Sequence, residues 1–117
     1  MGKYYVYVIE LDPKVSKVKK FRKKNPKYIP GNTCVYVGQS IRKPKLRFEQ
    51  HKEGYKANKY AKIYGLRLRK DLYEKYNPIP TRSDAEIIEK MLGENLRKKG
   101  VGVWYNWNCV ILFGEYL

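Results

Sequence analysis

Hydrophobic side chains are concentrated in three short segments that predict strands. Residues 3–11 are rich in Tyr, Val and Ile, as expected for a buried strand. Residues 33–38 are similarly apolar, which makes them a plausible antiparallel partner of the first segment. Leu and Arg alternate over residues 66–69, so this segment predicts a third strand with one basic face. We therefore expect a small central, mostly antiparallel three-stranded sheet.

Between these segments the pattern changes to one that favours helices. Pro44 and Gly54 bracket a helix-compatible segment, and a second short helix is expected over residues 57–64. Asp12-Pro13 precedes a short basic helix that ends before the break at Asn25-Pro26. With helices flanking the sheet, the predicted fold is α/β, of the α+β type.

The strongest helix signal covers about residues 84–99. Ser83 and Glu86 have the spacing of a capping box, and Gly100 terminates the segment. A stripe of apolar residues is expected to face the core: Ala85, Ile88, Leu92 and Leu96. Glu89 lies beside this stripe, where a carboxylate either reaches the rim of the core or points across the sheet at something that needs a negative charge. The helix pattern alone favours the rim.

The charge of the chain indicates a polyanionic partner. The 117 residues, enough for one domain, include 26 Lys and Arg against 11 Asp and Glu, giving a formal net charge of +15. Residues 14–27 contain eight basic residues and no acid, within a segment at about 12–31 that separates the first two strands. Nucleic acid is the leading partner and an anionic membrane the weaker alternative, since the basic helix is short. Acidic-tail and neutral-scaffold proteins are excluded.

Several other classes of protein are disfavoured. No apolar run approaches the roughly 20 residues of a membrane-spanning helix, and the N-terminus has no secretory signal, so a cytoplasmic location is expected. Cys34 and Cys109 with the single His51 cannot supply four ligands to a zinc ion. Both cysteines are expected to be small buried hydrophobic residues.

Six motifs, in order along the chain, resemble those of the GIY-YIG nuclease family. They are Val6-Tyr7, Tyr36-Val37-Gly38, Arg47, His51, the Ala85-x-x-x-Glu89 helix and Tyr105-Asn106. Arg47 follows Tyr36 by eleven residues and His51 follows four later, as in the family. The chain departs from the family in having Tyr5 where the family name has Gly, and in the basic insertion at 12–31. The stretch from His51 to Tyr64 is similar to that of small bacterial standalone members.

This resemblance implies a magnesium-dependent DNA endonuclease. The implied catalytic residues are Tyr7, Tyr36, Arg47, His51, Glu89 and Asn106. Glu89 would hold one Mg²⁺, with Mn²⁺ as a substitute, because no Asp-x-Asp or His-x-Asp cluster supports two metals. Arg47 would bind the scissile phosphate, Tyr7 or Tyr36 would be the general base, and His51 would relay the proton. Tyr7 is the preferred base, and Asn106 would fix the local geometry.

The basic residues are the candidate nucleic-acid contacts. They are Lys17, Lys20, Arg22, Lys23, Lys24, Arg42, Lys43, Lys45, Arg67 and Arg69. The expected partner is DNA, with RNA as an alternative, and neither a membrane nor a small-molecule cofactor is expected. The chain would act as a monomer or homodimer, and nicking would be nonspecific, structure-selective or partner-directed. The alternative function is a catalytically silent DNA- or RNA-binding module, in which Tyr7 and Tyr36 are only core aromatics.

Overall fold

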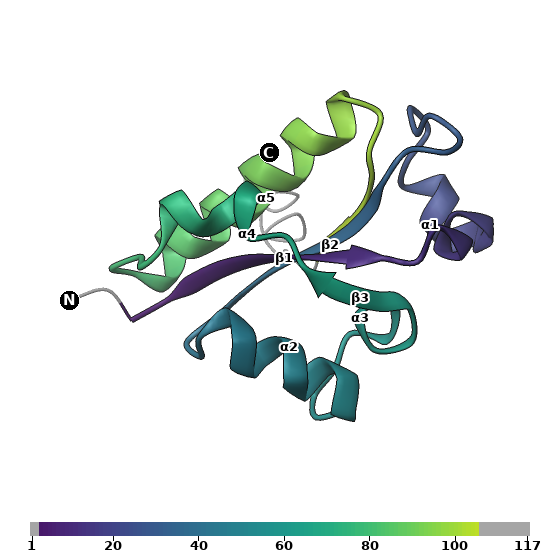
Figure 1. The fold of residues 1–117 in the computed structure, drawn as a ribbon. Coiled ribbons are helices and arrows are strands. Elements are labelled where there is room, and N and C mark those ends of the chain that lie inside the picture. Colours follow the sequence, from purple (N-terminus) through teal and green to yellow (C-terminus); the bar gives the residue numbers. More distant parts are fainter. Residues whose placement is uncertain (1–2, 106–117) are drawn as a thin grey trace, which may run out of the picture.

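One four-stranded sheet with helices on both faces organises residues 3–105, the part of the chain that the computed structural model describes (Figure 1). The strands are β1 (Tyr5–Leu11), β2 (Cys34–Ser40), β3 (Gly65–Leu68) and β4 (Gly102–Tyr105). Their spatial order is β3-β1-β2-β4. The α+β prediction is confirmed at this level, since all three expected strands are present.

The prediction of a three-stranded sheet is wrong, because β4 adds a fourth strand and makes the sheet mixed. β1 pairs antiparallel with both β2 and β3, whereas β4 pairs parallel with β2, from Cys34↔Gly102 to Val37↔Tyr105. The parallel pairing follows from the long crossover that returns the chain to the sheet. A strand of four residues that begins with glycine has too little pattern to be recognised alone.

The predicted helices are present, with shifted ends. The helical elements are η1 (Pro13–Lys17), α1 (Lys19–Lys23), α2 (Pro44–Glu53), α3 (Lys59–Tyr64), α4 (Lys70–Tyr73), η2 (Glu74–Tyr76) and α5 (Arg82–Lys98). The capping box predicted at Ser83 is wrong: Thr81 is the N-cap of α5, and its hydroxyl accepts a hydrogen bond of 3.1 Å from the Asp84 N–H. Sequence patterning did not predict α4, a single turn. Among residues 3–105, no helix is long and apolar enough to cross a membrane.

The two faces of the sheet are covered by different helices. Tyr7 and Tyr36 lie on the face that α2 covers, since both rings contact His51 of that helix. Alternation along the strands directs Val8 and Val37 to the opposite face, over which α5 passes. Figure 1 shows α5 above the sheet and α2 with α3 below it. The side chains in the core form one continuous hydrophobic cluster.

The basic insertion is joined to the core through a buried asparagine. Asn25 is 5% exposed, and its Nδ2 donates to Phe21 O at 2.8 Å and to Val103 O at 3.0 Å. Its Oδ1 accepts from Val103 N at 2.7 Å and from Arg97 Nε at 3.1 Å. These four bonds use the full capacity of the amide and tie the insertion to β4 and α5. The predicted basic helix is therefore a 3₁₀ turn followed by α1, fixed to the domain.

Candidate active site on the α2 face of the sheet

Gly38 leaves the space that the Tyr7 hydroxyl occupies. The two residues are direct partners in the β1–β2 ladder. A Cβ on Gly38 would lie 2.5 Å from Tyr7 Oη and 3.0 Å from Tyr36 Cε2, closer than real Cβ contacts allow. Tyr7 is 1% and Tyr36 3% exposed, and their ring centroids are 6.1 Å apart. The glycine of the Tyr36-Val37-Gly38 motif therefore sets the position of the Tyr7 hydroxyl.

His51 joins this buried pair from α2. It is 1% exposed, and its Nε2 lies 2.8 Å from Tyr7 Oη. On the other side of the ring, Nδ1 accepts a hydrogen bond of 3.1 Å from the backbone N–H of Asn58. A backbone N–H only donates, so Nδ1 carries no proton and the neutral ring holds its proton on Nε2. His51 is thereby assigned as a hydrogen-bond donor to the Tyr7 hydroxyl.

Burial lowers the pKa of His51 to about 4, with a further contribution from the positive charge of Arg47. The ring is therefore neutral near pH 7. A neutral ring with its proton already on Nε2 cannot take a second one from Tyr7 while the Asn58 bond persists. This arrangement differs from the expected proton relay, because the imidazole donates a hydrogen bond to the phenol, a bond that would favour the ionised form.

Arg47 is tied to the loop that follows α2. Its Nη1 donates to Tyr55 O at 3.1 Å and to Gln50 Oε1 at 3.3 Å, and its Nη2 donates to Lys56 O at 2.7 Å. A guanidinium has five N–H groups, so these three bonds leave two, and a hydrogen bond between Arg47 and Tyr7 is among the causes that lower the pKa of the phenol. The positive charge of Arg47 lowers the pKa of Tyr7, although burial has the larger and opposite effect.

Glu89 is buried, which corrects the expected position at the rim of the core. Its side chain on α5 belongs to a residue that is 3% exposed. Burial is the main cause that raises the pKa of both Tyr7 and Tyr36, and the Glu89 charge raises both further. The carboxylate thus acts on the same two hydroxyls as Arg47, from another helix.

Five of the six predicted catalytic residues therefore form one interacting cluster. They come from β1, β2, α2 and α5. Asn106 lies outside the described residues. Within residues 3–105, no group of three or more His, Cys, Asp or Glu side chains could hold a metal ion. A divalent cation here would have to depend on the single carboxylate of Glu89 and on ligands from solvent or substrate.

The predicted nucleic-acid contacts occupy two different environments. The basic side chains of the insertion are exposed, as are Arg42, Lys43 and Lys45 around the start of α2. By contrast, Arg67 on β3 and Arg69 just after it pair with acids. Arg67 Nη1 is 2.8 Å from Glu10 Oε1, and Arg69 lies 3.7 Å from the same oxygen and 2.9 Å from Asp71 Oδ2. These two arginines are therefore less available to phosphate.

Sequence reasoning missed Asn58, which supports two parts of the site. Its backbone N–H fixes the tautomer of His51, and its Oδ1 caps α3 by accepting from Tyr60 N at 2.9 Å and Ala61 N at 3.2 Å. Asparagine is a preferred N-cap, and this preference was the available signal. The bond to the histidine has no signature in sequence because it depends on the path of the loop.

Comparison with known proteins does not identify the chain, since no protein-family model, curated protein or solved structure matches it. The functional argument therefore depends on the residues and their geometry.

Proposed function

We propose that the chain is a magnesium-dependent DNA endonuclease of the GIY-YIG type that nicks one strand per event. The observation that carries this proposal is the Tyr7 hydroxyl. It is buried 2.8 Å from His51 Nε2, where the charges of both Arg47 and Glu89 also act on its pKa. The family resemblance in the sequence involves these same residues, and β4 would be an addition to the sheet typical of the family.

Tyr7 is the proposed general base toward the attacking water. Burial raises the pKa of this phenol, so at neutral pH its ionised form needs stabilisation. His51 supplies a hydrogen bond from Nε2–H, and Arg47 supplies positive charge. Tyr36, whose ring is beside that of Tyr7, would position the water or the phosphate.

Glu89 fits a magnesium ion by its chemistry. A buried carboxylate is costly unless a cation or hydrogen-bond donors compensate it, and oxygen is the ligand that Mg²⁺ prefers. One protein carboxylate suits Mg²⁺, which keeps several of its waters. Magnesium bound there would stabilise the leaving oxygen and offset the effect of the Glu89 charge on the two tyrosines.

Arg47 is the proposed phosphate ligand. The two N–H groups that its three bonds leave could donate to the non-bridging oxygens of the scissile phosphate. Arg42, Lys43 and Lys45, exposed nearby in the chain, would bind the flanking phosphates. These contacts reach phosphates rather than base edges, so selectivity would come from the structure of the DNA or from a partner.

One observation favours the alternative, a catalytically silent DNA- or RNA-binding module. Burial raises the pKa of Tyr36 as well as that of Tyr7, so neither phenol is prepared for deprotonation by the protein alone. Such a module would keep the fold and the basic surface without hydrolysing the phosphodiester bond.

Metal-dependent cleavage distinguishes the two functions. Supercoiled plasmid, branched DNA and structured RNA would be incubated with Mg²⁺, Mn²⁺ or chelator, using the wild type, Glu89→Gln and the matched variant Glu86→Gln. Glu86 is on the same helix and pairs with Arg82 at 3.6 Å. We expect wild type and Glu86→Gln to nick DNA only with metal, and Glu89→Gln to be about 10³-fold slower with unchanged binding. Intact substrates with salt-sensitive binding would instead establish the binding module.

A further inference from the structure

The insertion surrounds a cavity that is distinct from the candidate active site. This cavity has a volume of about 800 Å³ and is lined by four cationic side chains, those of Lys17, Lys19, Arg22 and Lys23. No acidic residue lines it. Among the described residues, none of the eight basic side chains of residues 14–27 forms an ion pair. The cavity therefore presents positive charge that no carboxylate of the described chain neutralises.

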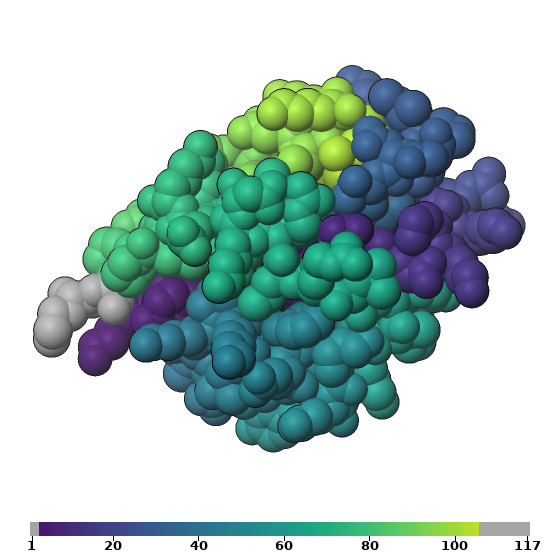
Figure 2. Space-filling view, in the orientation of Figure 1, coloured from purple at the N-terminus to yellow at the C-terminus, as the bar shows by residue number. Residues whose placement is uncertain are grey.

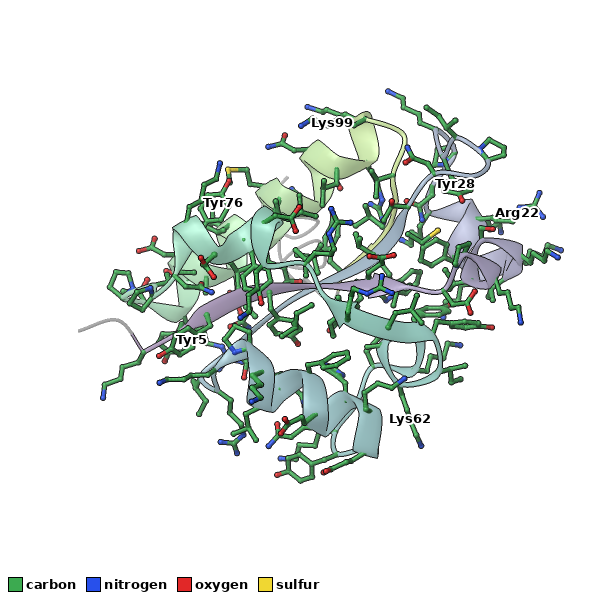
Figure 3. All side chains as sticks on the ribbon, viewed as in Figure 1. Tyr5, Arg22, Tyr28, Lys62, Tyr76 and Lys99 are labelled. Carbon is green, nitrogen blue, oxygen red and sulfur yellow. The ribbon has the colours of Figure 1, made fainter. Side chains whose placement is uncertain are left out.

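A second, smaller cavity adjoins the first. It has a volume of about 280 Å³, and Lys24, Lys27 and Lys98 contribute to its lining together with the ion pair of Glu94 and Arg97. Asn25, Pro26 and Tyr28 line both cavities. Figure 3 shows Tyr28 and Arg22 close together beside α1. Each cavity is therefore lined by cations together with the same tyrosine and proline, Tyr28 and Pro26.

The residues shared by the two cavities are held in place before any ligand binds. Asn25 makes the four hydrogen bonds to the core described above, and the Tyr28 N–H donates to Asn25 O at 3.1 Å. The Tyr28 hydroxyl donates to Asn32 O at 2.9 Å. A site whose central residues are already ordered loses less conformational entropy on binding.

This chemistry matches an unpaired nucleotide better than a duplex. Duplex backbone contacts need only exposed cations, whereas unpaired bases stack on aromatic side chains while cations bind the phosphates. Cavities of roughly 300–1,000 Å³ accommodate small organic ligands, a range that suits a base and its sugar. We propose that the insertion binds a single-stranded segment of nucleic acid, with a base against Tyr28 and phosphates on Lys19, Arg22 and their neighbours.

The position of this site also indicates which class of DNA the proposed nuclease would cut. This step rests on the proposed function. The insertion follows Leu11, four residues beyond Tyr7 on β1. At roughly 3.3 Å per residue, about 13 Å of strand separates Tyr7 from the start of the insertion. This distance corresponds to about four base-pair steps of 3.4 Å. The insertion and the α2–α3 region are exposed together in Figure 2. The substrate would be DNA with a junction between single and double strands, cut several nucleotides from the junction.

Binding measured in chelator separates this inference from the nuclease activity. Fluorescence anisotropy would follow a labelled oligothymidylate and a labelled hairpin duplex, using wild type, Lys19→Gln/Arg22→Gln, Tyr28→Leu and Tyr28→Phe. We expect the first two variants to weaken binding to the oligothymidylate about tenfold and to the duplex less than threefold. Tyr28→Phe keeps the ring and should bind as wild type does. Thermal melting would establish that each variant is folded.

Equal loss on both ligands for the Lys19→Gln/Arg22→Gln variant would overturn the inference, since the insertion would then be a general phosphate contact. No loss on either ligand would overturn it as well. Both lysine and arginine are exposed, so this variant is informative even if Tyr28→Leu fails to fold. Selective binding without any cleavage would retain the single-strand site and refute only the nuclease. If the wild type cuts, a flap substrate should be cut at a fixed distance from its junction, and the Lys19→Gln/Arg22→Gln variant should lose this preference.

Discussion

The candidate active site and the basic insertion differ in how they hold their polar groups. At the active site Tyr7, His51, Tyr36 and Glu89 are between 1% and 3% exposed, and the charges of Glu89 and Arg47 act on the pKa of both tyrosines. In the insertion the cations are exposed, and Asn25 is the one polar side chain that is buried. Chemistry on a phosphate needs fixed groups away from water, whereas affinity for it needs accessible charge. Changes in the first region should therefore alter the rate, and changes in the second the affinity.

The largest effect on stability is expected at Asn25, which joins the insertion to β4 and α5. Asn25→Ala would leave Val103 N and Arg97 Nε without the oxygen that accepts from them, and would remove one of the two donors to both Phe21 O and Val103 O. We therefore expect a loss of about 4 kcal/mol in the free energy of unfolding. Urea denaturation would measure it. Asn32→Ala is the control, because Asn32 is half-buried and its side chain makes two bonds, to Gly100 O and from Thr33 N. It should cost about 1–2 kcal/mol. Similar costs for both variants would mean that the insertion is not integrated into the core.

The next largest effect is a pH dependence of stability that arises from His51 in the candidate active site. Burial lowers the pKa of His51 from 6.5 to about 4, so between these pH values the unfolded chain binds a proton that the folded chain does not. The free energy of unfolding should therefore decrease by about 3 kcal/mol in total as the pH is lowered from 6.5 to about 4. Urea denaturation of wild type and His51→Gln at several pH values measures the difference. Parallel pH profiles for the two proteins would show that His51 is not held neutral.

The close contact between Gly38 and Tyr7 gives an intermediate effect. In Gly38→Ala the new methyl group would displace the Tyr7 hydroxyl from His51, costing about 2 kcal/mol of stability and tenfold or more in cleavage rate. Nicking assays and DNA-binding assays on the same protein would separate rate from affinity. We expect the affinity to be unchanged.

Gly93→Ala is the matched control for this prediction. Its Cβ would lie 2.5 Å from Tyr105 Cδ2, so it also introduces crowding, on a helix over the opposite face of the sheet. It should lower stability to a similar extent and leave the cleavage rate of the folded protein unchanged. Equal loss of rate in the two variants would mean that stability, rather than the Tyr7 position, limits activity.

The sequence predicted those helices and strands whose pattern of apolar and polar residues extends over several residues. The apolar composition of β1 and the spacing of Arg47 and His51 on α2 are both local features, and the structure confirms the buried strand and the helix that they predict. The burial of Glu89 was not predicted, because exposure at the edge of an apolar stripe depends on what packs beside it. β4 could not be recognised either, since a four-residue strand owes its place to pairing with β2.

Residues that connect distant segments were the least predictable. Asn25-Pro26 was correctly predicted to end a helix, but the bonds from Asn25 to Val103 span 78 positions. Asn58 likewise acts on His51 through a backbone N–H, which every residue except proline has. The family resemblance therefore indicated which groups take part in the cluster, while the groups that orient them became evident only in three dimensions.

The smallest effect is expected on β3, where cations resemble those of the insertion in sequence but not in environment. Glu10 and Asp71 already pair with Arg67 and Arg69, so phosphate would have to compete with these carboxylates. The Arg67→Gln/Arg69→Gln variant should therefore bind an oligothymidylate within threefold of wild type. Lys19→Gln/Arg22→Gln removes the same two charges from side chains without ion pairs, so it should lose about tenfold and reduce the dependence of affinity on salt. Anisotropy titrations at two salt concentrations measure both quantities. If the two variants lost affinity equally, net charge alone would govern binding, and the contrast between a paired and an unpaired basic surface would be wrong.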